Sequence, residues 1–195
     1  MAWLELDKSL FLWINGLSGH SQIIDNVISA IANDYFSIVF GCMIMMALWT
    51  GTPDPDKRRH IQKGIMVASA SLGTCQGMVE IINNLWQRAR PFHDLDVNLL
   101  FYPPTDPSFP SNSATVLFGM AWGIFIYNRK AGSVLLVLAG LMGFSRVYVG
   151  VHYPLDIIGG MAVGLLVALF FTIVFRLLDP LINRVIDTMR FFFLA

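Results

Sequence analysis

The sequence predicts an all-α integral membrane protein, a bundle of five to six transmembrane helices. Hydrophobic residues make up 55% of the 195-residue chain and charged residues only 13%, about half the charged fraction of an average soluble domain. The mean hydropathy of +0.62 points the same way. Apolar stretches long enough to cross a bilayer, about 20 residues each, recur along the chain. A net charge of zero and the lack of a basic tract argue against a nucleic-acid partner.

Residues 1–33 hold two short amphipathic stretches that precede the first clear span. Each has apolar residues at helical spacing, but each is too short and too polar to cross a bilayer alone. We expect interfacial or re-entrant helices here, which add a sixth span if they cross the membrane together. Within a single membrane-embedded domain, residues 1–195, we expect a core bundle over 34–178 and a cytoplasmic tail over 179–195.

Five stretches with few charges give the expected spans. They are residues 35–53, 60–87, 111–128, 132–144 and 154–175. In the last of them, glycines at positions 159, 160 and 164 allow close helix packing.

The second span ends in a stripe of polar residues. Gln76, Glu80, Asn83, Asn84 and Gln87 recur at three- and four-residue intervals, which places them on one side of a helix. Polar groups at membrane depth normally face the interior of a bundle. The stripe serves either hydrogen bonding between helices or one wall of a polar site, and the sequence leaves both interpretations open.

Positive charge predicts the orientation of the bundle. Seven basic residues fall on one side: Lys57, Arg58, Arg59, Lys63, Arg129, Lys130 and Arg176. By the positive-inside rule this side is cytoplasmic. Arg90, Ser111, Arg146 and His152 fall at loop ends on the opposite side. Because the two arginines stand against the topological bias, we expect them to serve chemistry at a site that faces the periplasm or its equivalent.

Three polar clusters, residues 88–92, 108–113 and 145–156, converge on that side. Arg90 and Arg146 are permanently charged, planar groups that can hold phosphoryl oxygens by two hydrogen bonds each. Arg88 is either part of the first cluster or an anchor at the membrane surface. The third span begins near Ser111, where a helix N-terminus offers amide donors and a favourable dipole to an anion.

The third cluster adds a candidate nucleophile. His152 can attack phosphorus through one ring nitrogen if Asp156, four residues later on the same helical face, holds the other nitrogen. This scheme needs no metal or other cofactor, and the carboxylates are too scattered along the chain to suggest a magnesium site.

These motifs resemble the three-part signature of the type 2 phosphatidic acid phosphatase family. The matching residues are Arg90-Pro91, Pro110-Ser111 and Ser145-Arg146 with His152 and Asp156. The resemblance covers nearly the whole chain and implies the six-helix bundle shared with vanadium haloperoxidases, a metal-independent lipid phosphatase activity, and lipid phosphates and membrane lipids as partners. Residues 90–92 and 106–111 are most similar to the bacitracin-resistance type of undecaprenyl-diphosphate phosphatase.

The resemblance also implies roles for individual residues. His152 is the expected nucleophile and Asp156 its orienting partner. The expected phosphate ligands are Arg90, Ser111, Asn112, Arg146 and Asn83, with Ser145 assisting.

Three positions depart from the family pattern. Asn83 stands where the first motif begins with Lys, and Asn112 stands where Gly or Asp is common. Ser113 stands where the second motif ends in the His that resembles a general acid. General acid catalysis typically contributes about 10²–10⁴-fold, and a lipid alkoxide needs it more than a lipid monophosphate does. The departure therefore favours a polyprenyl diphosphate as substrate, with His93 as a candidate substitute acid.

Three hypotheses follow from the sequence. The first is an enzyme, impaired by Ser113, that converts a lipid diphosphate to the monophosphate through a phosphohistidine at the outer membrane face. The second is a lipid-phosphate binder or transporter with a cationic pocket and no turnover. The third is a family enzyme inactivated by a change at position 113. The sequence leaves the chain length of the lipid and the oligomeric state open.

Overall fold

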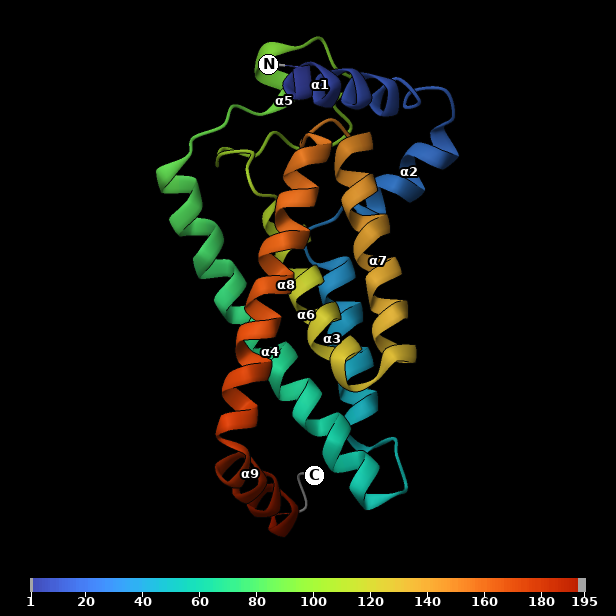
Figure 1. Ribbon diagram of the computed structural model, residues 1–195. Coiled ribbons are helices and arrows are strands. Elements are labelled where there is room, and N and C mark those ends of the chain that lie inside the picture. The colour runs from blue at the N-terminus through green and yellow to red at the C-terminus, as the bar shows by residue number, and fades with distance from the viewer. Residues whose placement is uncertain (1, 193–195) are drawn as a thin grey trace.

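The computed structural model describes residues 2–192, and every regular element in that range is a helix (Figure 1). In chain order the helices are α1 (Ala2–Asn15), α2 (Gln22–Ile31), α3 (Phe36–Thr50), α4 (Pro55–Leu85), α5 (Pro91–Asp94), α6 (Asn112–Tyr127), α7 (Arg129–Tyr148), α8 (Pro154–Leu177) and α9 (Asp179–Phe191). Met1 and residues 193–195, the ends of the expected N-terminal segment and tail, lie outside the described residues.

Three of these helices, α4, α7 and α8, are long and apolar enough to cross a membrane. Helices α2 and α3 pass the same test together, but they are bent by 55° at their junction, as in a broken span or a re-entrant loop. Helix α6, with 16 residues, is a shorter apolar helix. The predicted all-α membrane bundle is confirmed. Over residues 2–192, length and composition support three or four spans rather than the five to six expected, because α2 and α3 are bent apart and the enclosed helix α6 is shorter than a full span.

Helix α6 lies at the centre of the bundle, between α4, α7 and α8 (Figure 1). It carries no charged residue, and residues 113–121 are buried, as expected for a helix that is apolar on all sides. Glycine brings α8 close to it, because a Cβ added at Gly164 would lie 2.6 Å from the backbone nitrogen of Gly119. Gly160 lies in the same contact, whereas Gly159 faces an aromatic ring of the loop before α6.

Several helix boundaries differ from the predicted spans by a few residues, and two of these differences have a clear cause or consequence. Helix α4 begins at Pro55, ahead of the expected start at residue 60, because the Asp54 side chain caps the backbone amides of Asp56 and Lys57. Helix α7 continues to Tyr148 instead of ending at residue 144. Arg146 therefore stands in the last turn of a helix, which fixes its direction more tightly than a loop would.

The two ends of the bundle are closed by different helices (Figure 1). Helices α1 and α5 lie across one end, where Phe11 of α1 packs into a buried cluster formed by the α7–α8 loop. Helix α9 lies at the other end, held to α4 by ion pairs of Asp179 with Lys63 at 2.5 Å and of Asp187 with Arg59 at 2.7 Å. All three polar clusters lie at the α1 end.

Candidate active site

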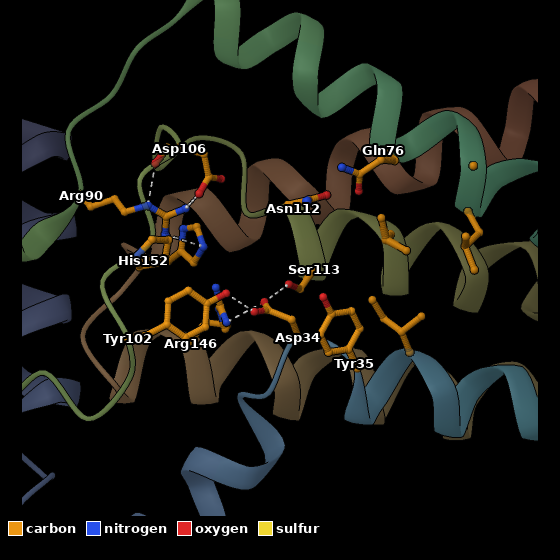
Figure 2. A pocket seen from close by; sticks show the side chains of 15 residues that line it. Asp34, Tyr35, Gln76, Arg90, Tyr102, Asp106, Asn112, Ser113, Arg146 and His152 are labelled. Atoms are coloured by element: carbon orange, nitrogen blue, oxygen red, sulfur yellow. Dashed lines mark hydrogen bonds and ion pairs between the residues drawn. The ribbon is translucent and has the colours of Figure 1, made fainter.

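A cavity of about 720 Å³ lies between the α2–α3 loop, α3, α4, α6 and the end of α7, and the three sequence motifs meet in its wall (Figure 2). Arg90 comes from the loop before α5, Asn112 and Ser113 from the first turn of α6, Arg146 from the last turn of α7, and His152 from the α7–α8 loop. The apolar body of α6 is enclosed by the bundle, and its polar first turn reaches the cavity together with Val116.

The His152 ring is held in one tautomer by its neighbours. Its Nδ1 lies 2.9 Å from the carbonyl oxygen of Ser108. A carbonyl only accepts hydrogen bonds, so Nδ1 carries the proton. Nε2 is then the bare nitrogen, and it accepts from Nη1 of Arg90 at 3.1 Å. Burial lowers the pKa of His152 to about 4, and Arg90 and Arg146 act in the same direction, against Asp156. The ring is therefore neutral at physiological pH.

Asp156 organises the segment behind the histidine. Its Oδ2 lies 3.6 Å from Nδ1 of His152, which is longer than a hydrogen bond. The same oxygen accepts from Oγ of Ser108 at 2.5 Å and from the backbone nitrogen of Tyr153 at 2.8 Å. Its other oxygen accepts from Nη1 of Arg88 at 2.6 Å. The carboxylate thus acts on the ring mainly through Ser108, whose carbonyl accepts the hydrogen bond from Nδ1–H.

Arg90 is buried, and acceptors surround its guanidinium group. Its Nη1 donates to the carbonyl oxygen of Val151 at 3.0 Å and its Nε to that of Asp106 at 2.8 Å. Its Nη2 also pairs with the Asp106 carboxylate at 2.9 Å. The carboxylate is 48% exposed, so an incoming phosphate can replace it at the guanidinium while the backbone contacts stay in place.

Arg146 binds a carboxylate that no sequence motif contains. Its Nη1 lies 3.0 Å from Oδ1 of Asp34, which belongs to the α2–α3 loop, and it also donates to the carbonyl oxygen of Ala32 at 3.0 Å. The guanidinium stacks on the ring of Phe101, with its carbon 4.8 Å from the ring centre. Its Nε is buried without a hydrogen-bond partner. Arg146 therefore keeps donor capacity for a further oxygen.

Comparison with known proteins fits this arrangement. Residues 64–179, more than half of the chain, match the family model described as the PAP2 superfamily. The chain belongs to the PAP2 superfamily. Undecaprenyl-diphosphatase BcrC of Bacillus subtilis (strain 168) is 30% identical over 183 residues, which are 93% of this chain and 90% of that protein. The protein is accordingly a membrane lipid phosphatase, a hydrolase.

Two further relatives extend the comparison. The bacitracin transport permease protein BcrC of Bacillus licheniformis is 30% identical over 171 residues, covering 87% of this chain and 81% of that protein. The crystal structure of Aquifex aeolicus LpxE superposes with a TM-score of 0.62 at 24% identity, covering 84% of this chain and 93% of that one. At this identity the structural match supports the fold alone.

The other residues expected from the PAP2 motifs take different places. Ser111 precedes α6, donates its backbone nitrogen to the carbonyl oxygen of Asp156 at 3.1 Å, and has a buried hydroxyl without a partner. Ser145 donates its hydroxyl to Met142 in its own helix at 2.7 Å and does not line the cavity. His93 is exposed, contacts the ring of Phe92 at a tilted angle, and also lies outside the cavity wall.

Asn83 belongs to a second, neighbouring hollow of about 330 Å³. Its wall includes most of the polar stripe of α4, namely Gln76, Glu80, Asn83 and Asn84. Gln76, Asp106 and Asn112 line both hollows. The stripe thus forms one wall of a polar groove beside the cavity, the second of the two interpretations that the sequence left open.

Sequence reasoning missed Asp34 and Tyr102, which line the cavity, and Asp7, which acts behind it. It placed Asp106 and Ser108 in the motif segments but gave them no role, and the structure puts Asp106 in the cavity wall and Ser108 behind it. Asp7 of α1 pairs with Nη2 of Arg88 at 2.6 Å and accepts from the backbone nitrogen of Leu155 at 2.9 Å. Arg88 is therefore a bridge between two buried carboxylates rather than a surface anchor. Across residues 2–192, no three His, Cys, Asp or Glu side chains gather into a group able to hold a metal ion.

Proposed function

We propose that the protein hydrolyses a polyprenyl diphosphate to the monophosphate and inorganic phosphate, through a phosphohistidine on His152. The observation that carries this proposal is the bare Nε2 of a neutral, buried histidine in a cavity wall shared with Arg90 and Arg146. The name of the Bacillus subtilis relative, undecaprenyl-diphosphatase, supports the same substrate class, as does the resemblance of the motifs to phosphatases of that type.

The first step follows from this geometry. The terminal phosphoryl group takes the Arg90 N–H groups now paired with Asp106 and the free donors of Arg146. Nε2 of His152 then forms a bond to phosphorus while the bond to the bridging oxygen breaks. The lipid monophosphate leaves with the electron pair. The Nδ1 proton stays in place against Ser108, which stabilises the positive charge that develops on the ring.

The lipid monophosphate is the leaving group that this site can serve. Ser113 lines the cavity where the family motif places a histidine, and a serine hydroxyl is a poor general acid at neutral pH. A lipid monophosphate can leave without first being protonated. A lipid alkoxide is much more basic and needs a proton in order to leave. Ile38, Leu72 and Val116 also line the cavity and supply an apolar wall for the first isoprene unit.

We further propose that this site faces the periplasm or the cell exterior, with α1 lying in the membrane interface and residues 179–191 on the cytoplasmic side. The basic residues of α4 that pair with α9 support this orientation under the positive-inside rule. A single cysteine at position 96, in the loop after α5, should react with a membrane-impermeant maleimide from outside intact cells. Labelling only after the cytoplasmic side is opened would reverse the orientation.

The alternative function is a lipid-phosphate binder or transporter, and the name of the Bacillus licheniformis relative, a transport permease, is the reason to test it. One assay separates the two functions. Purified protein is given farnesyl or undecaprenyl diphosphate, and phosphate release is compared with that of His152→Ala. We expect release from the unchanged protein and more from Ser113→His. No release above the His152→Ala blank from either protein supports the binder. Release from Ser113→His alone supports an enzyme inactivated at position 113.

A further inference from the structure

The α2–α3 loop brings a carboxylate next to Ser113, the residue that replaces the histidine of the PAP2 motif in this chain. Oδ1 of Asp34 lies 3.0 Å from Oγ of Ser113. Asp34 lines the same cavity as His152, and Figure 2 shows its carboxylate turned toward Ser113 and the Arg146 guanidinium. Its side chain is 25% exposed, so it meets both the protein wall and the water of the cavity.

Three donors hold this carboxylate. Besides Ser113, Nη1 of Arg146 donates to Oδ1 at 3.0 Å and the hydroxyl of Tyr102 donates to Oδ2 at 2.5 Å. The hydrogen bond to Asp34 raises the pKa of Tyr102, so the phenol keeps its proton. All three neighbours are donors, so both oxygens of Asp34 act as hydrogen-bond acceptors. An acceptor in this position suits the role of a base rather than that of an acid.

The proposed route needs such a group in its second half. After the lipid monophosphate has left, a water molecule must attack the phosphorus of phospho-His152 and lose a proton as it does so. Ser113 cannot serve as the base, because a neutral serine hydroxyl does not itself accept a proton at neutral pH. We propose that Asp34 is a further catalytic residue, the general base for hydrolysis of the phosphohistidine. This inference rests on the proposed function.

The step balances without another reactant. The water oxygen forms a bond to phosphorus, the bond from phosphorus to Nε2 breaks, and its electron pair returns to the ring. The water proton passes to the Asp34 carboxylate, and inorganic phosphate is released. The open cavity then returns the proton to bulk water. Arg146 contacts Asp34 through one nitrogen only, which leaves its remaining donors to hold the phosphoryl oxygens during the attack.

The other carboxylates near the cavity are less suited to this step. Asp156 is fully buried behind the histidine and saturated by Ser108, Tyr153 and Arg88. Asp106 pairs with Arg90, where the proposed first step places the phosphate. Asp34 alone among these three contacts the residue at position 113.

The test follows formation and loss of the phosphohistidine separately. Purified Asp34→Asn is mixed with undecaprenyl diphosphate, and lipid monophosphate, inorganic phosphate and protein-bound phosphate are measured over time, the last by phosphorus NMR and mass spectrometry. We expect one equivalent of lipid monophosphate, phosphate retained on His152, and a steady-state rate about 10²-fold lower, as is typical for loss of a general base. Adding Ser113→His to this variant should restore turnover.

Matched variants make the outcome specific. Asp106→Asn, which removes another carboxylate from the same cavity, should not accumulate phosphohistidine. Asp34→Glu, which keeps the carboxylate, should slow hydrolysis more than formation, and it carries the test if Asp34→Asn does not fold. A higher KM with no retained phosphate in Asp34→Asn overturns the assignment, as does loss of phosphohistidine formation. If the unchanged protein neither forms phosphohistidine nor releases phosphate, the proposed function itself fails.

Discussion

Nδ1 of His152 lies 2.9 Å from the carbonyl oxygen of Ser108 but 3.6 Å from Oδ2 of Asp156. The backbone carbonyl, not the carboxylate, is therefore the nearest acceptor for the ring proton. The carboxylate in turn binds Oγ of Ser108 at 2.5 Å. Ser108 thus serves the histidine twice, by its carbonyl directly and by its hydroxyl through Asp156. A change at its side chain should affect catalysis although the side chain contacts no substrate.

Ser108→Ala should lower kcat about tenfold with little change in KM. The substitution removes the hydrogen bond to Asp156, a bond to a charged group that contributes about 1.5–3 kcal/mol, and so loosens the carbonyl that orients the ring. Single-turnover measurement of phosphohistidine formation checks this. Ser71→Ala is the control, because that buried hydroxyl bonds only Val67 of its own helix at 2.8 Å. Equal effects of the two substitutions would contradict the role given to Ser108.

The low pKa of His152 predicts its behaviour in acid. Burial lowers this pKa to about 4, so the ring should remain a neutral nucleophile at pH 5, where a free histidine is mostly protonated. Nitrogen NMR of the labelled protein in micelles, with His152→Ala to assign the signal, checks the titration. A midpoint near 6.5 for this ring would contradict the prediction.

The same shift predicts how stability depends on pH. The folded pKa of His152 lies below its unfolded value, so the unfolded chain binds a proton first as the pH falls. The contribution of this group is complete above about pH 6.5 and is lost as the pH falls toward 4, by roughly 3 kcal/mol at most. Thermal unfolding midpoints of the unchanged protein and of His152→Gln, measured from pH 7 to pH 4, should therefore converge in acid.

The sequence motifs were sufficient to predict those site residues whose place follows from the order of the apolar spans. Arg90, Arg146 and His152 stand at fixed distances from the ends of apolar spans, so the order of the spans assigns them to one side of the membrane. The structure brings all three to the cavity wall. The extension of α7 through Arg146 was not predicted, because the polar motif resembles a loop while its backbone continues the helix.

The residues that were missed depend on tertiary structure. Asp34 reaches Ser113 because the chain bends by 55° between α2 and α3, and no periodic pattern encodes that bend. Asp7 reaches Arg88 only because α1 folds across the end of the bundle. Before the structure is known, an isolated carboxylate in an amphipathic or loop segment has the same appearance as an ordinary solvent-exposed charge.

Asp7→Ala should destabilise the protein by about 2 kcal/mol and lower activity as well. It removes the charged partner of Arg88 and the acceptor for the backbone nitrogen of Leu155 at the start of α8, and bonds to charged groups contribute about 1.5–3 kcal/mol each. Arg88 keeps Asp156, which limits the loss. Thermal unfolding in detergent gives the measurement. Glu5→Ala, in the same helix and exposed, should leave the midpoint unchanged. A midpoint for Asp7→Ala equal to that of Glu5→Ala would contradict the bridge.

Gly164→Ala and Gly140→Ala should change stability in opposite directions. A Cβ at Gly164 would lie 2.6 Å from the backbone nitrogen of Gly119, so α8 must move away from α6, at a cost of about 1–3 kcal/mol. A Cβ at Gly140 meets nothing within 4 Å, and alanine there should stabilise α7 by up to about 1 kcal/mol through its helix propensity.

The same pair of variants should differ in activity. The backbone nitrogen of Ser111, at the start of α6, donates to the carbonyl oxygen of Asp156, at the start of α8, at 3.1 Å. Separating the two helices therefore also moves the carboxylate behind His152. Gly164→Ala should therefore lose kcat together with stability, whereas Gly140→Ala keeps kcat. A stable Gly164→Ala variant with full activity would show that the α6–α8 contact does not position the site.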